Sequence, residues 1–204
     1  MENIFFHEQD LPDGFDFGDS VAIDTETMGL NLNRDRLCLV QLSGGDEIAH
    51  LVRFKGNYDA PNLKKLLEDK NVLKIFHFGR FDIAAMYKYL GANVAPVYCT
   101  KIASKLVRTN TESHSLKTLC YELLGVELEK ESQCSDWGAE KLSEAQMKYA
   151  ANDVLYLHKI KAELDKRLLR EGRTELAAKC FEFLPVRAKL DILGWGGDIF
   201  SHSN

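Results

Sequence analysis

The chain has 204 residues, 45% hydrophobic and 28% charged, a composition typical of globular proteins with enough length for a sizeable core. Its 26 basic and 31 acidic residues give a formal net charge of −5, which argues against coating long nucleic acid but not against binding a small anion. No apolar run approaches the roughly 18 residues of a membrane span, and the acidic, polar N-terminus does not resemble a signal peptide.

The apolar patterning predicts strands in the first half of the chain and mostly helices in the second. The expected strands lie at 2–8, 21–27, 37–42, 47–53, 72–77 and 97–99. The expected helices lie at 61–69, 80–90, 100–108, 115–124, 143–170 and 173–191. Gly44-Gly45-Asp46 is typical of a hairpin turn, so the sheet should begin with antiparallel neighbours. With no repeat or obvious linker, we expect one α/β domain over 1–204, a mixed β-sheet flanked by helices with a helical C-terminal half.

Cysteine usage indicates the compartment. The chain has an odd number of cysteines without C-x-x-C spacing: Cys38, Cys99, Cys120, Cys134 and Cys180. This pattern predicts reduced thiols in a cytoplasmic protein rather than disulfides or a zinc site.

Two carboxylates end the strand expected at 21–27. Alternate side chains of a strand share one face, so Asp24 and Glu26 should project together. Like charges this close raise each other's pKa unless a cation lies between them. A divalent metal with oxygen ligands explains the pair, and two solvated acids at a strand end are the alternative.

Two later segments add acidic residues. Asp82 follows His77-Phe78-Gly79 at a strand-to-helix junction, where a carboxylate also stabilises the start of a helix. Tyr149 and Asp153 are four residues apart and should share one helix face, a spacing that is also common by chance. The small residues between them, Ala150 and Ala151, allow this helix to approach another element closely.

Together these segments resemble the ribonuclease D-like family, in the tyrosine-bearing branch of the DEDD exonuclease superfamily. The resemblance rests on Ala22-Ile23-Asp24-Thr25-Glu26-Thr27, His77-Phe78-x-x-Phe81-Asp82, Ser135-Asp136-Trp137 and Tyr149-Ala150-Ala151-x-Asp153-Val154-x-Tyr156-Leu157. The histidine branch has His five residues before the last aspartate, where this chain has Lys148. The resemblance implies a ribonuclease H-like (DnaQ-like) fold and a 3′→5′ exonuclease.

The resemblance also implies two divalent cations, Mg²⁺ or Mn²⁺, which stabilise the attacking and leaving oxygens of phosphodiester cleavage. Asp24 would bridge both ions, and Glu26 and Asp153 would complete the site on the nucleophile side. Asp82 would hold the second ion, partly through water. Tyr149, with an ordinary pKa of roughly 10, would orient the attacking water as a hydrogen-bond donor.

A basic stretch is expected to hold the substrate's 5′-phosphate or backbone. Lys101, Lys105 and Arg108 recur on one face of the expected helix, which also carries Ser104. His114 and Lys117 open the next helix, whose free N–H groups suit a phosphate. A solvated basic face is the alternative.

Other substrate contacts are expected around the carboxylates. Leu30, just past the first carboxylate strand, is a candidate wedge between two bases, and ordinary packing explains a loop leucine equally well. We also assign Thr25, His77 and Phe81 to substrate binding, because they belong to the matching motifs.

Further segments resemble the nano-RNase C group: Arg36-Leu37-Cys38, Cys99-Thr100-Lys101-Ile102-Ala103-Ser104-Lys105-Leu106, Phe183-Leu184-Pro185-Val186-Arg187-Ala188 and Leu193-Gly194-Trp195. The chain also ends before the additional helical domains of ribonuclease D proper. The resemblance implies hydrolysis of 5′-phosphorylated RNA dinucleotides, including pGpG-type products, to nucleoside monophosphates. It further implies a ring-shaped homo-octamer, for which the Trp-bearing C-terminus would supply contacts, although core packing explains that segment as well.

Three alternatives stay open on the sequence. They are a general 3′→5′ exonuclease on longer RNA or single-stranded DNA, a proofreading-type DNA exonuclease subunit, and a non-catalytic nucleic-acid-binding module. The last is expected only if the acidic set is broken, and the chain has all four carboxylates and Tyr149.

Overall fold

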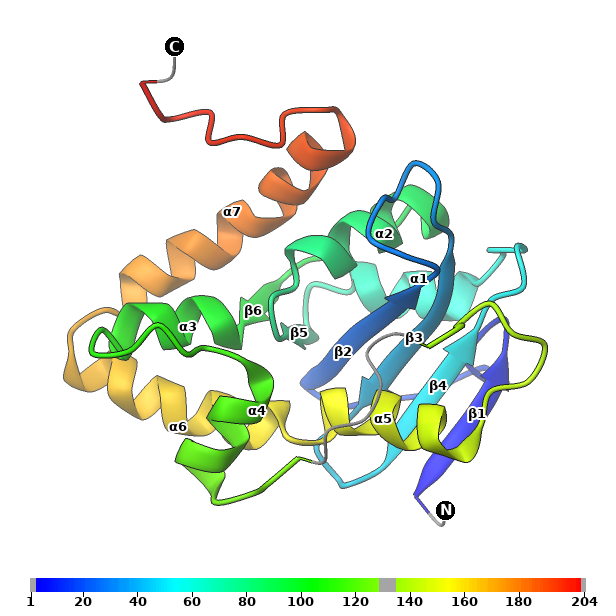
Figure 1. The fold of residues 1–204 in the computed structure, drawn as a ribbon, viewed down its shortest axis with the longest axis horizontal. Helices are drawn as coiled ribbons and strands as arrows, with labels where there is room; N and C mark the ends of the chain where they lie inside the picture. Colours follow the sequence, from blue (N-terminus) through cyan, green and yellow to red (C-terminus); the bar gives the residue numbers. More distant parts are fainter. Residues whose placement is uncertain (1–2, 129–134, 203–204) are drawn as a thin grey trace.

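The computed structural model describes residues 3–128 and 135–202 and places a mixed sheet at the centre of the fold (Figure 1). Its strands are β1 (Ile4–Glu8), β2 (Ser20–Thr27), β3 (Leu37–Ser43), β4 (Ala49–Arg53), β5 (Leu73–Phe76) and β6 (Val97–Cys99). They lie in the order β1-β4-β3-β2-β5-β6. β2, β3 and β4 are antiparallel neighbours, as predicted, whereas β1 is parallel to β4, and β5 is parallel to both β2 and β6.

Helices surround the sheet and form most of the second half of the described chain. They are α1 (Pro61–Glu68), α2 (Arg80–Leu90), α3 (Thr100–Val107), α4 (Leu116–Leu119) with a π-helical turn η1 (Cys120–Leu124), α5 (Glu144–Leu155), α6 (Leu157–Arg170) and α7 (Thr174–Ile192). The expected α/β architecture is confirmed. No helix in the described ranges combines the length and apolar character that crossing a bilayer requires.

Apolar clusters cover both faces of the sheet, which explains the unbroken burial of β3 and β4. On one face, side chains such as Val40 and Ile23 join a core that includes Leu63 of α1 and Ile83 of α2. On the other face, Leu39 and Leu51 pack with Trp137 and with Ala150 of α5. α5 therefore crosses the sheet on the side of these last residues (Figure 1).

Local signals set the ends of the helices that position the site. Ser143 and Gln146 form a reciprocal capping box at the start of α5, which fixes the frame of that helix. α2 ends at Gly91, whose φ of 61° lies in the left-handed region where a residue without Cβ is favoured.

The prediction of a single helix over 143–170 is wrong. The structure has two helices, α5 and α6, which meet at Tyr156. The apolar pattern continues through this point without Gly or Pro, so the sequence does not indicate a break. The two helices contact different elements, because α5 packs on β2, β3 and β4 whereas α6 packs on α3 and β5. A change of direction at Tyr156 allows both contacts.

The other differences from the expected elements are small. The helix expected over 115–124 is α4 continued by the π-helical turn η1, and it ends at Gly125 with φ 68°. Four cysteines are free thiols, as expected: Cys38, Cys99, Cys120 and Cys180. Cys134 lies outside the described residues.

Candidate active site

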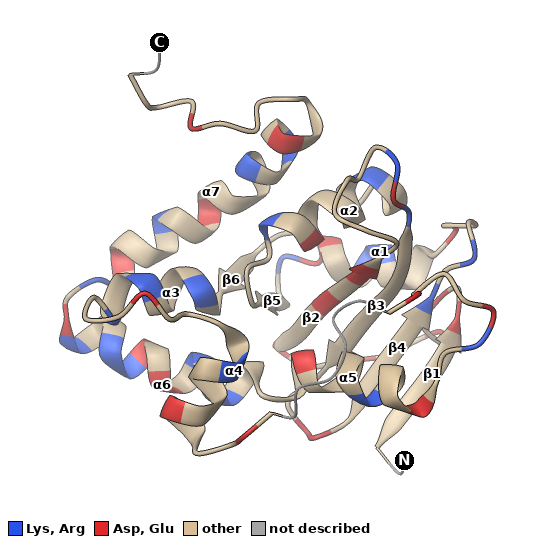
Figure 2. Ribbon diagram, in the orientation of Figure 1, with Lys and Arg blue, Asp and Glu red and all other residues tan. Residues whose placement is uncertain are grey.

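Three carboxylates meet where α5 crosses the end of β2. Asp24 and Glu26 project from one face of β2, and α5 brings Asp153 against them, so that one oxygen from each lies within 4.8 Å of the others. Figure 2 shows the acidic segments of β2 and α5 facing each other and basic segments on α3. Segments about 130 residues apart in sequence thus build one acidic group.

Burial and mutual repulsion disfavour the charged forms of these carboxylates. Removal from water raises the pKa of Asp24 well above its ordinary value, and the charges of Asp82, Asp153 and Glu26 raise it further. Burial, with Asp153 and Asp82, raises the pKa of Glu26 to about 9. Burial raises the pKa of Asp153 to about 7, against a hydrogen bond from Tyr149 that lowers it.

Asp82 approaches the group from α2. Its Oδ1 accepts a 2.6 Å hydrogen bond from the hydroxyl of Thr25, which lies on the face of β2 opposite Asp24. Burial raises the pKa of Asp82 to about 6, and the Thr25 hydrogen bond holds it below the value that burial alone would give. The turn before α2 requires Gly79, because a Cβ there would lie 2.6 Å from Cβ of Phe76.

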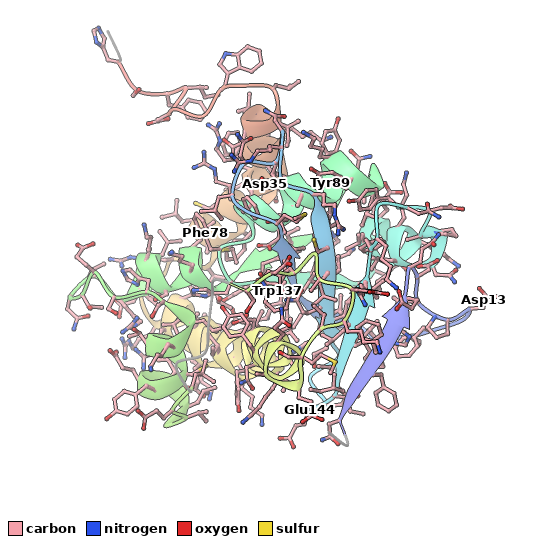
Figure 3. The ribbon with its side chains drawn as sticks, turned by 45° about the vertical axis from the view of Figure 1, so that its right-hand side comes forward. Asp13, Asp35, Phe78, Tyr89, Trp137 and Glu144 are labelled. Atoms are coloured by element: carbon pink, nitrogen blue, oxygen red, sulfur yellow. The ribbon has the colours of Figure 1, made fainter. Side chains whose placement is uncertain are left out.

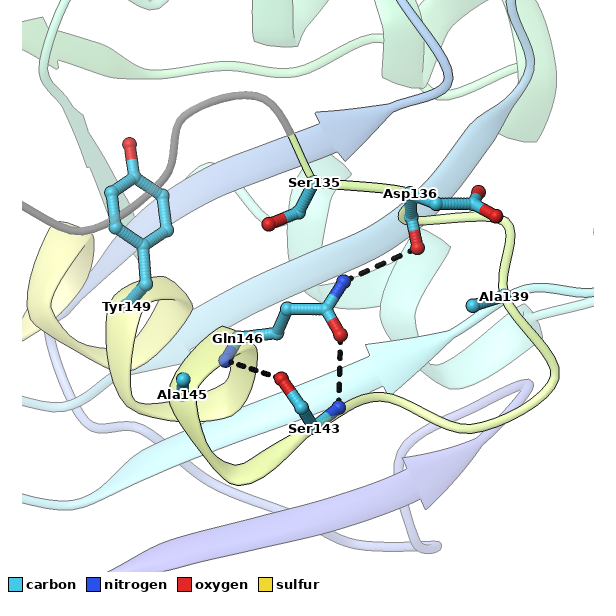
Figure 4. Close-up of a pocket in the computed structure, with 7 residues that line it drawn as sticks. All are labelled: Ser135, Asp136, Ala139, Ser143, Ala145, Gln146 and Tyr149. Atoms are coloured by element: carbon cyan, nitrogen blue, oxygen red, sulfur yellow. Dashed lines mark hydrogen bonds between the residues drawn. The ribbon is translucent and has the colours of Figure 1, made fainter.

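Tyr149 stands one turn before Asp153 on α5, as predicted, and the two share a hydrogen bond. Its ring lies 6.1 Å from the buried ring of Trp137, which fixes one side of the tyrosine. A cavity of about 320 Å³ extends from Tyr149 along α5 (Figure 4). The other residues that line it are Ser135, Asp136, Ala139, Ser143, Ala145 and Gln146.

A second cavity, of about 400 Å³, lies beside α2. Its lining includes Leu30, Phe78, Phe81 and, from the C-terminal end of α7, Asp191 and Ile192. The side chain of Leu30 is 87% exposed, which excludes the alternative explanation that this leucine packs in the core.

The loop that carries Leu30 is anchored to α2. The hydroxyl of Tyr89 lies 2.9 Å from the carbonyl oxygen of Leu32 and 3.0 Å from that of Asp35 (Figure 3). Asp35 in turn accepts a 2.9 Å hydrogen bond from the backbone N–H of Asn31. These bonds hold the loop while leaving the side chain of Leu30 in solvent.

The residues of the expected basic face differ in exposure. Lys105 is exposed and Lys101 half-buried, with Nζ 4.4 Å from the ring centre of Phe78. Arg108, only 4% exposed, turns inward and donates to Ser104 Oγ, to the carbonyl oxygen of Ser113 and to Glu122. The sequence spacing does not show this difference, because Arg108 is the C-cap residue that follows α3 and has left the helical conformation.

The remaining predicted substrate residues lie on or beside α3 and α4. The Ser104 hydroxyl lies 2.8 Å from His114 Nδ1, and both residues are buried. Lys117 lies in α4, and the Ser115 side chain accepts the Thr118 N–H at the start of that helix. His77 Nδ1 lies 2.8 Å from the Thr100 hydroxyl, and burial together with Lys101 lowers the pKa of His77 to about 4. His77 is therefore neutral at neutral pH.

Sequence reasoning did not select Phe78, Arg80 or Asp191. Phe78 is 48% exposed and has φ 65°, an uncommon conformation for a bulky residue, in the turn before α2 (Figure 3). Arg80 binds both carboxylate oxygens of Asp191, at 2.5 and 2.6 Å, and so joins α2 to the end of α7. Phe78 lies inside a recognised motif, but no sequence signal pairs residues 80 and 191.

The acidic group suits a divalent cation. It offers hard oxygen ligands at short mutual distance, and a bound cation would offset the burial and mutual repulsion that raise the pKa values of Asp24 and Glu26.

The chain belongs to the 3′-5′ exonuclease family, whose model matches residues 9–169. Its structure is similar to that of NrnC from Brucella melitensis, with 55% identity, a TM-score of 0.97 and 100% of both chains covered. The predicted resemblance to nano-RNase C is thereby confirmed. NrnC has been solved with pGG (56% identity, TM-score 0.95, 98% of this chain and 99% of that chain) and with Mg²⁺ (54%, 0.94, 98% and 100%).

The chain is also similar to ribonuclease D proteins. It is 36% identical to ribonuclease D of Gluconacetobacter diazotrophicus over 158 residues, which cover 78% of this chain and 40% of that protein. Escherichia coli RNase D has a similar structure, with 27% identity, a TM-score of 0.74, and 84% of this chain and 45% of that chain covered. The chain thus spans less than half the length of these ribonucleases and corresponds to their exonuclease fold.

Proposed function

We propose that this chain is a single exonuclease domain that hydrolyses short RNA from the 3′ end. Its preferred substrates are 5′-phosphorylated dinucleotides, including pGpG-type products. Its products are nucleoside monophosphates. The observation that carries the chemistry is the group of Asp24, Glu26 and Asp153, with Asp82 beside it. The substrate length is supported by the similarity to NrnC, which binds pGG.

In this proposal four carboxylates hold two divalent cations, Mg²⁺ or Mn²⁺. Asp24 would contact both ions, Glu26 and Asp153 would complete the site of the ion on the nucleophile side, and Asp82 would hold the other, partly through water. The bound ions stabilise negative charge on the attacking and leaving oxygens. The carboxylates would have to ionise to bind the ions, and their raised pKa values couple ion binding to the release of protons.

Tyr149 orients the water that attacks the phosphorus. Its hydroxyl is fixed by the hydrogen bond to Asp153, and its ring is fixed by Trp137. A phenol in its neutral form is a hydrogen-bond donor and acceptor at neutral pH, so it holds a water molecule without removing its proton.

The cavity beside α2 supplies the contacts to the bases. Leu30 and Phe78 stand exposed at its edge, and Phe81 lies in its wall. Its volume of about 400 Å³ is in the range of small-ligand pockets, roughly 300–1,000 Å³. In this arrangement Leu30 separates the two bases. Thr25 acts mainly through Asp82, and neutral His77 offers a hydrogen bond without adding charge.

Cationic and polar groups on α3 and α4 bind the 5′-phosphate. Lys101 and Lys105 are the accessible cations of α3, and Lys117 is the cation of α4. Ser104, Arg108 and His114 form a hydrogen-bonded set behind them, and in this proposal they act on the phosphate or through these neighbours. A terminal phosphate held by these groups would limit the length of RNA that fits.

The protein is further proposed to act in the cytoplasm as a homo-oligomer, namely an octamer. Several large apolar side chains of the C-terminal segment are exposed in one chain: Leu193, Trp195, Ile199 and Phe200. Their burial between subunits would remove this surface from water.

Cleavage rates on RNAs of two, five and ten nucleotides test the proposal. We expect the dinucleotide to be cleaved fastest. Cleavage of every RNA should require Mg²⁺ or Mn²⁺, and Asp24→Ala should abolish it. Equal rates on all lengths would support a general exonuclease on longer RNA or single-stranded DNA instead. Activity retained in Asp24→Ala would contradict the two-ion site.

A further inference from the structure

Gln41 is the cross-strand neighbour of Asp24. The β2–β3 register pairs the two residues directly, so their side chains share one face of the sheet. Gln41 is fully buried, and its amide nitrogen donates to Asp24 Oδ2 at 3.4 Å. A residue outside the four carboxylates and Tyr149 therefore contacts a central carboxylate of the site.

The other end of this amide is unpaired. Among the residues that the structure describes, Oε1 of Gln41 has no hydrogen-bond partner. A buried polar atom without a partner costs folding free energy, whereas an apolar side chain of similar size would not. Most other residues of β3 are apolar and buried, which makes the amide an exception in this strand. Core packing therefore gives no reason for a glutamine here.

The chemistry of the amide supplies a reason. A side-chain amide has a donor and an acceptor in fixed relative positions and carries no charge, so it contacts an acidic group without adding to its repulsion. Cations such as Mg²⁺ keep several water ligands, whose O–H groups need acceptors. The amide nitrogen of Gln41 donates to Asp24, and the oxygen of the same amide is left without a partner.

We infer that Gln41 is a positioning residue of the metal centre. Its N–H group orients the carboxylate of Asp24, and its Oε1 accepts a hydrogen bond from water in the hydration shell of a bound cation. This inference rests on the metal-dependent function proposed above. Gln41 would then raise the affinity of the site for the cation without being a ligand of it.

Mg²⁺ binding to the full chain, measured by calorimetry in the absence of RNA, tests the inference. Gln41→Met replaces the amide with an apolar side chain of similar length, and Gln41→Leu is measured in parallel. Partners of metal ligands typically contribute about 10- to 100-fold in affinity, so we expect the Kd for Mg²⁺ to rise by that factor in both variants. In EDTA the melting temperature should change little, since the loss of the unpaired oxygen offsets the loss of the hydrogen bond to Asp24.

Ser43→Ala is the matched control. Ser43 is also buried on β3, two residues along on the same face, and its hydroxyl accepts the N–H of Gly45 rather than contacting a carboxylate. Its Mg²⁺ affinity should match that of the native sequence. Unchanged Mg²⁺ affinity in both Gln41 variants, whether or not their melting temperatures in EDTA fall, would overturn the inference and make the amide structural. Absence of Mg²⁺ binding by the native chain would instead contradict the proposed function.

Discussion

The hydroxyl of Thr25 donates a 2.6 Å hydrogen bond to Oδ1 of Asp82 and so joins the far face of β2 to the first turn of α2. This bond favours the ionised form of Asp82, whose pKa burial raises to about 6. In Thr25→Val the bond is lost, the pKa of Asp82 rises, and a higher pH is needed to ionise it. We expect the acidic limb of the pH–rate profile to move to higher pH. At pH values well below the pKa, activity should fall by about tenfold for each unit by which the pKa of Asp82 rises. Thr25→Ser keeps the hydroxyl and should retain the native profile, and a Thr25→Val profile that overlays it would contradict this role.

Raised carboxylate pKa values make the metal-free fold less stable at high pH. The pKa of Glu26 is about 9 in the folded chain against 4.5 ordinarily, so between these values the folded state holds more protons than the unfolded state. The free energy of unfolding therefore falls as pH rises through this window. Buried histidines with lowered pKa values, such as His77, contribute the opposite slope, so the comparison must be made with a variant.

Glu26→Gln isolates this effect. In EDTA we expect its melting temperature to exceed that of the native sequence, by more near pH 8 than near pH 5. Mg²⁺ should raise the melting temperature of the native sequence more than that of Glu26→Gln, since the variant lacks one ionised ligand. Differential scanning fluorimetry measures both effects. A difference between the two proteins that does not change with pH would refute the assigned cause.

Loss of the Tyr149 hydroxyl should affect the chemical step. We expect Tyr149→Phe to lower kcat by about 10²- to 10⁴-fold, the usual contribution of a group that handles the reacting proton or water. Single-turnover rates at saturating dinucleotide measure this. Tyr121→Phe, at a tyrosine that is 65% exposed in η1, is the control and should keep native rates. A Tyr149→Phe rate within a few-fold of native would remove Tyr149 from the reaction.

Leu30→Ala should weaken binding of the dinucleotide without lowering the stability of the fold. The side chain is 87% exposed, so Leu30→Ala is expected to change the free energy of unfolding by no more than about 0.5 kcal/mol. We expect KM for a dinucleotide to rise about tenfold, because one apolar contact with a base is lost. Leu169→Ala, at a leucine that is 76% exposed in α6, controls for loss of surface area. Equal KM values in the two variants would show that Leu30 does not contact the bases.

The sequence was most informative where chemistry and local pattern coincide. Asp24 and Glu26 were placed on one face by strand alternation alone, and Tyr149 and Asp153 by helical spacing. Joining the two pairs required the resemblance to a family, because spacing does not show which helix crosses which strand.

The missed features depend on tertiary contacts. Gln41 lies in an apolar run that predicts a strand, but its importance follows from its register with Asp24. Arg80 and Asp191 are 111 residues apart and meet only because α7 packs on α2. Arg108 matched the spacing of a basic face, yet it is drawn inward by Ser113 and Glu122, which belong to the following segment.

A time course on 5′-labelled RNAs of two to ten nucleotides with Mg²⁺ tests the central claim most directly. The account predicts that the dinucleotide disappears fastest and that none accumulates from the longer RNAs, since any dinucleotide formed is consumed at once. A dinucleotide that builds up as an end product would contradict it.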